Sequence, residues 1–138
     1  MKTILKIALL IGLATAFSAR VQADPVLVGN AAFSGNVLDA DGVKAVLLGK
    51  RVTVGDVRVT IVIAKASEAQ DKFLTESVGM TTSQFQNHWR RLFMTGGGSA
   101  PKVVETDVEA AKLAAETPGA VAMIDDTKAD RLTVLSRK

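Results

Sequence analysis

The first 23 residues have the pattern of a removable secretory signal peptide, and this pattern fixes how much chain remains to fold. Lys2 and Lys6 precede an apolar stretch at residues 7–17, and residues 21–23 (Val-Gln-Ala) supply a small-residue cleavage site. The apolar stretch is shorter than the roughly 18 to 20 residues that span a bilayer. We therefore expect cleavage after Ala23, a mature chain of residues 24–138 in the periplasm, and no membrane insertion after cleavage.

The leader also accounts for the positive charge of the whole chain. The chain has 17 Lys and Arg residues against 14 Asp and Glu residues. Removing Lys2, Lys6 and Arg20 leaves 14 basic residues, so the mature chain is formally neutral and no basic surface argues for a nucleic-acid partner. The absence of cysteine excludes disulfides and thiolate metal sites. The remaining chain of about 115 residues fits a single domain with one core.

Strand and helix signals alternate along the mature chain. Short apolar or β-branched runs predict strands, and turn residues separate these runs from stretches with helical periodicity. The expected strands cover residues 25–29, 57–63, 102–104, 120–124 and 132–135. The expected helices run from Asp39 or Asp41 to Leu48, from Ser67 to Val78, onward from Thr81, and from Thr106 to before Pro118. This order predicts an α/β fold, a small three-layer sandwich with a mostly parallel sheet.

One of the expected helices carries an aromatic stripe. Residues 81–84 (Thr-Thr-Ser-Gln) have capping-box spacing, and Phe85, Trp89, Leu92 and Phe93 then fall on one face of the helix. A periodic apolar face of this kind is far more often core than a platform for a cofactor. We therefore expect this helix to pack into the core, and we expect no cofactor.

The chain offers few residues for catalysis or metal binding. His88, its only histidine, lies on a different face of the aromatic helix and has no second His, Cys or glutamate at ligand spacing. Asp125, Asp126 and Asp130 depart from the spacing of a calcium loop, and residues 96–99 (Gly-Gly-Gly-Ser) lack a phosphate-loop pattern. We expect no metal site, no catalytic residues and no enzymatic activity.

The strongest candidate for a binding site is the helix start at Ser67. Backbone N–H groups of Glu68, Ala69 and Gln70 and the positive end of the helix dipole can hold an anion, to which Ser67 adds a hydroxyl and Lys65 a charge. Ordinary N-capping by Ser67 explains the same residues without a ligand, and the Glu68 carboxylate would compete for the positive field. Both interpretations stay open from these residues alone.

Four segments, taken in their order and spacing, resemble a known family. They are residues 46–50 (Val-Leu-Leu-Gly-Lys), 67–80, 88–96 and 117–120 (Thr-Pro-Gly-Ala). Together they resemble the short substrate-binding-like proteins of phosphate ABC transporters, which are relatives of the type 2 periplasmic binding proteins. The resemblance extends over residues 26–135 and implies that residues 24–138 form a single, reduced periplasmic-binding-protein-like domain.

In that family, hydroxyls, backbone N–H groups at helix starts and an arginine hold phosphate between two lobes. The resemblance implies that Ser67 is the serine of such a helix start, and that Asn30 and Ser34 supply ligands from the loop after the first strand. Ile63 stands where the arginine usually is, and no glycine follows Ser67. Two hypotheses result: a periplasmic protein that binds phosphate or another small oxyanion beside a membrane transporter, or a ligand-free module that docks a periplasmic protein.

Overall fold

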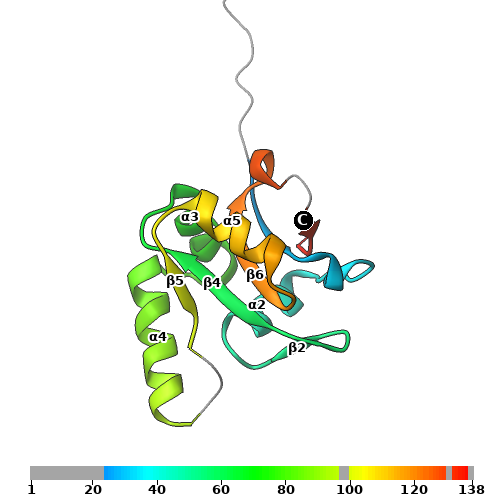
Figure 1. Cartoon of the computed structure of the whole chain (residues 1–138). Helices are drawn as coiled ribbons and strands as arrows, with labels where there is room; N and C mark the ends of the chain where they lie inside the picture. Colours follow the sequence, from blue (N-terminus) through cyan, green and yellow to red (C-terminus); the bar gives the residue numbers. More distant parts are fainter. Residues whose placement is uncertain (1–23, 97–99, 130–131, 137–138) are drawn as a thin grey trace, which may run out of the picture.

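A five-stranded sheet forms the centre of the computed structural model, which describes residues 24–96, 100–129 and 132–136 (Figure 1). Its strands are β1 (Pro25–Gly29), β4 (Thr60–Ala64), β5 (Lys102–Val104), β6 (Ala120–Asp125) and β7 (Thr133–Val134). Their order across the sheet is β5-β4-β6-β1-β7. Only β1 runs against its neighbours, so this sheet is mostly parallel, as predicted. The expected signal peptide at residues 1–23 lies outside the described residues.

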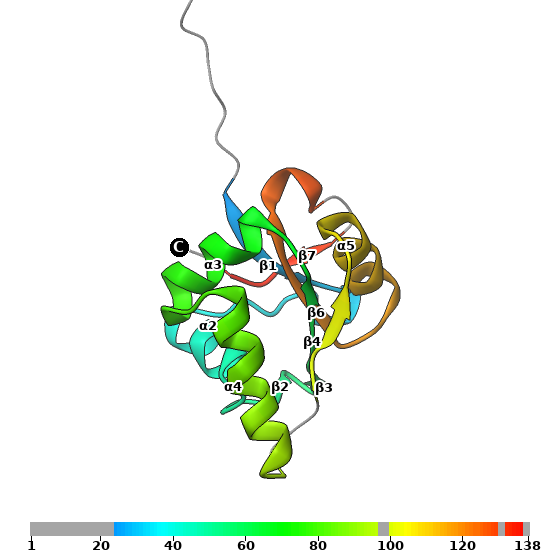
Figure 2. The same cartoon turned by 90° about the vertical axis from the view of Figure 1, so that its left-hand side faces the viewer.

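Helices cover both faces of the sheet, which confirms the predicted three-layer architecture (Figure 2). One face carries α2 (Ala40–Leu47), α3 (Glu68–Val78) and α4 (Thr82–Met94), and the other carries α5 (Asp107–Glu116). No helix within the described residues has both the length and the apolar character needed to cross a bilayer.

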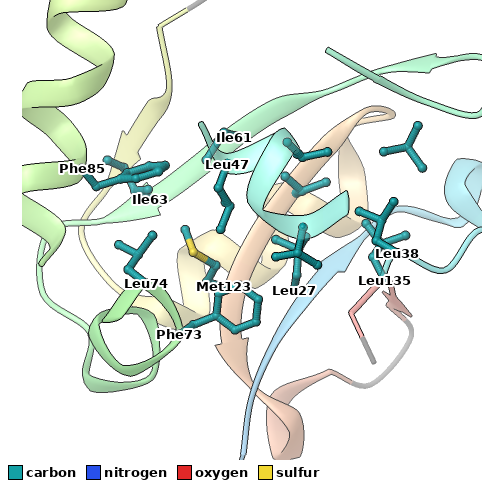
Figure 3. Close-up of a cluster of buried hydrophobic side chains, with 14 of the residues drawn as sticks. Leu27, Leu38, Leu47, Ile61, Ile63, Phe73, Leu74, Phe85, Met123 and Leu135 are labelled. Atoms are coloured by element: carbon teal, nitrogen blue, oxygen red, sulfur yellow. The ribbon is translucent and has the colours of Figure 1, made fainter. Parts of the chain in front are cut away.

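The side chains of β6 alternate between two cores, as the pleat of a strand requires. Val121 and Met123 enter the larger core under α2, α3 and α4. Figure 3 shows this core, in which Leu74 of α3 and Phe85 of α4 lie on the same side of the sheet as Met123. The other face carries small residues, including Ala122 of β6, so that α5 can pack close to the strands.

The predicted strand at residues 57–63 is two strands in the structure. Its first part, β3 (Val57–Arg58), pairs with β2 (Thr53–Val54) as a hairpin around Gly55. The partner changes within two residues: Val59 N donates to Val52 O at 2.9 Å, whereas Thr60 N donates to Gly119 O at 2.8 Å. The β-branched run does form strands, as predicted. The local sequence, however, does not indicate that the partner strand changes between Val59 and Thr60.

Helix α4 is longer than the core that it covers. Phe85 and Trp89 are buried as predicted, and Leu92 is partly buried, but Phe93 is 56% exposed. The helix has 13 residues, and its last turns continue past the sheet in both views (Figures 1 and 2). The aromatic stripe is therefore core at its start and surface at its end.

Candidate functional site

Helix α3 begins directly after β4, at the carboxyl end of the parallel strands. Ser67 is its N-cap, and its Oγ accepts a hydrogen bond from Gln70 N at 3.1 Å. The first bond of the helix backbone runs from Asp71 N to Ser67 O at 3.0 Å. The N–H groups of Glu68 and Ala69 precede this bond and point out of the helix end. These two N–H groups are what the start of α3 offers to an anion.

Gln70 has a different place from the one expected of a ligand-binding residue. Its side chain is only 1% exposed. Its Oε1 accepts from Ala64 N at 2.8 Å, while its Nε2 donates to Ala64 O at 2.9 Å and to Thr82 Oγ1 at 3.1 Å. The backbone N–H of Gln70 is also occupied, by Ser67. Gln70 therefore ties the start of α3 to the end of β4 and to the start of α4, which makes it a positioning residue.

Lys65 lies at the same edge and carries an ion pair. Its Nζ is 2.8 Å from the carboxylate of Glu105, and both side chains are largely exposed. The hydrogen bond that Lys65 donates to Glu105, and then the negative charge of this carboxylate, raise the pKa of Lys65 above its ordinary value, so Lys65 is fully charged at neutral pH. Because exposed ion pairs contribute little stability, this pair can open and let Lys65 meet an anion.

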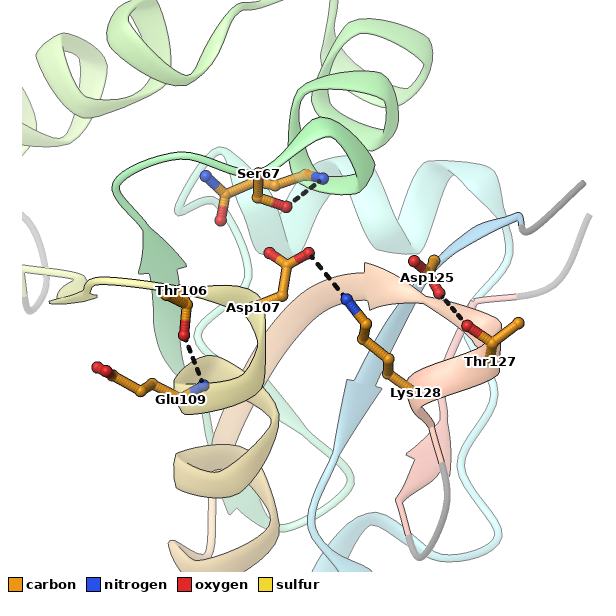
Figure 4. A network of polar contacts seen from close by, with 8 residues as sticks. Ser67, Thr106, Asp107, Glu109, Asp125, Thr127 and Lys128 are labelled. Atoms are coloured by element: carbon orange, nitrogen blue, oxygen red, sulfur yellow. Dashed lines mark hydrogen bonds and ion pairs between the residues drawn. The ribbon is translucent and has the colours of Figure 1, made fainter.

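The start of a second helix lies at the same edge as the start of α3. The sequence analysis predicted this helix but not its position beside Ser67. Helix α5 follows β5, the parallel neighbour of β4, and its N-cap Thr106 accepts from Glu109 N at 3.3 Å. Figure 4 shows Ser67 and Asp107, from the two helix starts, together with Asp125 at the end of β6. The capping-box spacing at Thr106 was visible in the sequence, but only the strand order shows that it lies beside Ser67.

Asp107 brings negative charge to this edge. Its Oδ2 is 3.8 Å from Lys128 Nζ. Its Oδ1 is buried, with no hydrogen-bond partner within the part of the chain that the structure describes. A carboxylate in the first turn of a helix is stabilised by the helix dipole. The negative charge of Asp107 therefore offsets part of the positive potential that the start of α5 would present to an anion. The start of α3 also has two carboxylates in its first turn, Glu68 and Asp71, so this effect does not distinguish the two helix starts. What distinguishes the start of α3 is the positive charge of Lys65, two residues before its N-cap.

Asn30 lies at the opposite end of the sheet from Ser67. Because β1 runs antiparallel to β6, its last residue Gly29 pairs with Val121, near the start of β6. Asn30 then caps the short helix η3 (Ala31–Phe33), and its Nδ2 donates to Ala115 O at 2.6 Å. The length of β4, about 13 Å at 3.3 Å per residue, separates this end from the start of α3.

The structure thus divides the expected ligand residues into two groups. Lys65, Ser67 and the N–H groups of Glu68 and Ala69 lie together at the carboxyl edge of β4. The exposed Ser34 follows η3 and stays with Asn30 at the far edge. A single small anion can contact only one of these groups.

Two further residues singled out from the sequence lie within the packed interior or against it. Ile63 is 1% exposed and belongs to the core under α4. The Nε2 atom of His88 is 3.0 Å from Leu48 O, and its ring lies edge-on to Trp89. Within the described ranges, no group of three His, Asp or Glu side chains is arranged to hold a metal ion.

Comparison with known proteins identifies the fold through solved structures alone. No protein-family model and no curated protein matches the sequence. One similar structure, from Clostridium perfringens, is named as a phosphate ABC transporter substrate-binding protein with bound phosphate; its TM-score is 0.59 at 12% identity, over 82% of this chain and 44% of that one. Another, an ABC-type phosphate transport receptor from Vibrio cholerae, has a TM-score of 0.50 at 17% identity, over 82% of this chain and 45% of that one.

These similarities show the fold alone, a mixed α/β arrangement with a mostly parallel sheet that matches part of two neighbours with a periplasmic-binding-protein fold. One neighbour is named as a substrate-binding protein of a transporter and the other as a transport receptor, and neither is named as an enzyme. The chain spans less than half the length of either neighbour.

Proposed function

We propose that this chain is a periplasmic solute-binding-like protein that holds a small oxyanion, phosphate first among them, at the start of α3. The observation that carries this proposal is the pair of N–H groups at Glu68 and Ala69, which leave the helix end beside the hydroxyl of Ser67 and the charged Lys65. A phosphate-bound structural neighbour supports the choice of ligand, and the names of both neighbours support an ABC transporter as the partner.

The backbone at the start of α3 favours an anion, although nearby side chains, Glu68 and Asp107 among them, carry negative charge. Ligands of open α/β sheets bind beyond the carboxyl ends of the parallel strands, where the helix starts present N–H groups and a partial positive charge. The Glu68 side chain is exposed and can turn toward solvent. Because Lys65 and Glu68 are exposed and one helix start supplies the N–H groups, we expect modest binding by the chain alone, with a Kd of about a millimolar.

The test is a thermal shift of the purified full chain with and without 10 mM sodium phosphate. At a Kd of about a millimolar, this concentration stabilises the folded state by about 1.4 kcal/mol, which raises the melting temperature by roughly 5 °C. Ser67→Asp keeps a good N-cap but places a negative charge against the bound anion. We expect this variant to fold normally and to lose the phosphate-dependent rise.

Thr81→Asp is the matched control, because it makes a similar change at the N-cap of α4. It should keep the full response to phosphate. The proposal is wrong if Ser67→Asp responds like the unchanged chain, or if potassium chloride at equal ionic strength produces the same rise.

A second candidate is the ligand-free module that docks a periplasmic protein through the same fold. It is favoured by the pairing of Lys65 with Glu105 and by the distance of Asn30 and Ser34 from Ser67. The absence of any rise with phosphate or sulfate, in a chain that melts cooperatively, would select this candidate.

A further inference from the structure

Helix α4 and the edge strand β5 enclose a groove that neither the phosphate proposal nor the sequence analysis uses. Its volume is about 360 Å³, within the range of small-molecule sites. It lies on the α4 side of the sheet, whereas the anion site lies beyond the carboxyl end of β4. Its floor, walls and rim include Ile63, Trp89, Arg90, Phe93, Pro101 and Val103.

The floor of the groove is held in place, and two of its apolar wall residues are exposed in the part of the chain that the structure describes. Trp89 is 6% exposed, and its Nε1 donates to Leu47 O at 2.9 Å, which holds the indole ring in place. Phe93 is 56% exposed and Val103 is 49% exposed. Large apolar side chains that line an exposed hollow beside a rigid aromatic ring are typical of a binding surface.

Arg90 gives the groove one positive charge. Its Nη1 donates to Asn87 Oδ1 at 2.8 Å, and no carboxylate within the described ranges lies at ion-pair distance. A guanidinium has five N–H donors in a planar fork that matches a carboxylate. The groove therefore combines apolar walls with the positive charge of Arg90 and the amide of Gln86, which can both bond to an anionic group.

The edge of β5 is poorly suited to an added strand, which argues against an extended peptide as the occupant. Val104 O accepts from Lys65 N, so Val104 faces β4 and the alternate residues face outward. Of these, Pro101 has no N–H, and Glu105 N already donates to the Glu109 carboxylate at 3.3 Å. Among the described residues of this edge, only Val103 has an outward N–H and an outward C=O that are both free to pair, which is too little for strand pairing.

We propose that this groove binds a small organic acid with an aliphatic or aromatic body. Its carboxylate pairs with Arg90, and its body lies against Trp89, Phe93 and Val103. This site is separate from the phosphate site, and either can exist without the other.

The test uses the fluorescence of Trp89, the chain's only tryptophan. Sodium octanoate is titrated into the purified full chain, with octanamide as the uncharged probe of equal length. We expect a saturable change with octanoate. Arg90→Gln should weaken it by about tenfold or more, as the loss of a charge-assisted bond predicts. Phe93→Ser, at an exposed position, should weaken it as well.

Arg91→Gln is the matched control, because Arg91 is the next residue of α4 and does not line the groove. It should leave octanoate binding unchanged. The proposal is overturned if octanoate gives no saturable change, if octanamide binds as tightly, or if Arg91→Gln weakens binding as much as Arg90→Gln.

Discussion

Gly119→Ala is expected to destabilise the protein by more than about 4 kcal/mol, a loss that single substitutions rarely reach. Gly119 has φ +88°, and a Cβ atom there would lie 2.3 Å from the carbonyl oxygen of Arg58. The obstacle is a backbone atom, so no side-chain rotation relieves it. Gly119 O also accepts from Thr60 N at 2.8 Å, where β4 begins beside β6. Urea unfolding followed by Trp89 fluorescence measures the loss.

Gly79→Ala is the matched control for this prediction. Gly79, the C-cap of α3, has φ +70°, but a Cβ there would meet nothing within 4 Å. Gly79→Ala should lower the free energy of unfolding by roughly 1–2 kcal/mol, which is the cost of placing an alanine in the left-handed conformation. Equal losses in the two variants would show that conformation, and not the contact with Arg58, makes glycine necessary at position 119.

Gly119 belongs to one feature that the local sequence predicts, the end of a helix, and to one that it does not predict, a contact with a distant segment. Residues 118–119 (Pro-Gly) predict the end of a helix, and α5 does end at Glu116. The N-caps Ser67, Thr81 and Thr106 are likewise confirmed, because each cap is satisfied within three residues of itself. The contact of Gly119 with Arg58 joins distant segments, and no local pattern predicts it.

The direction of β1 is the feature that sequence reasoning lacked. An apolar run such as residues 25–29 predicts a buried strand but does not choose its neighbours or their direction. Because β1 pairs with β6 in antiparallel register, Asn30 and Ser34 lie at the opposite end of the sheet from the start of α3. Because β5 pairs with β4 in parallel, Thr106, which follows β5, lies at the same edge as Ser67, which follows β4. The helix start at Ser67 was therefore predictable from the sequence, and its surroundings were not.

Gln70→Met is expected to destabilise the protein by about 2–5 kcal/mol. Methionine has nearly the volume of glutamine, so packing is largely preserved. The N–H and C=O groups of Ala64, which now bond to the Gln70 side chain, would remain buried without partners. Each such group costs about 1–3 kcal/mol. Urea unfolding measures the loss, and hydrogen exchange at the Ala64 amide should become faster than in the unchanged chain.

Gln84→Met makes the same chemical change at the surface and serves as the control. Gln84 is exposed, and its side chain accepts one hydrogen bond, from Thr81 N at 2.9 Å. Its replacement should cost less than about 1 kcal/mol, because water can replace that bond. If Gln70→Met lowers the free energy of unfolding no more than Gln84→Met does, the hydrogen bonds between Gln70 and Ala64 do not stabilise this edge of the sheet. A large loss that occurs together with a weaker phosphate response would instead show that the anion site depends on the hydrogen bonds between Gln70 and Ala64.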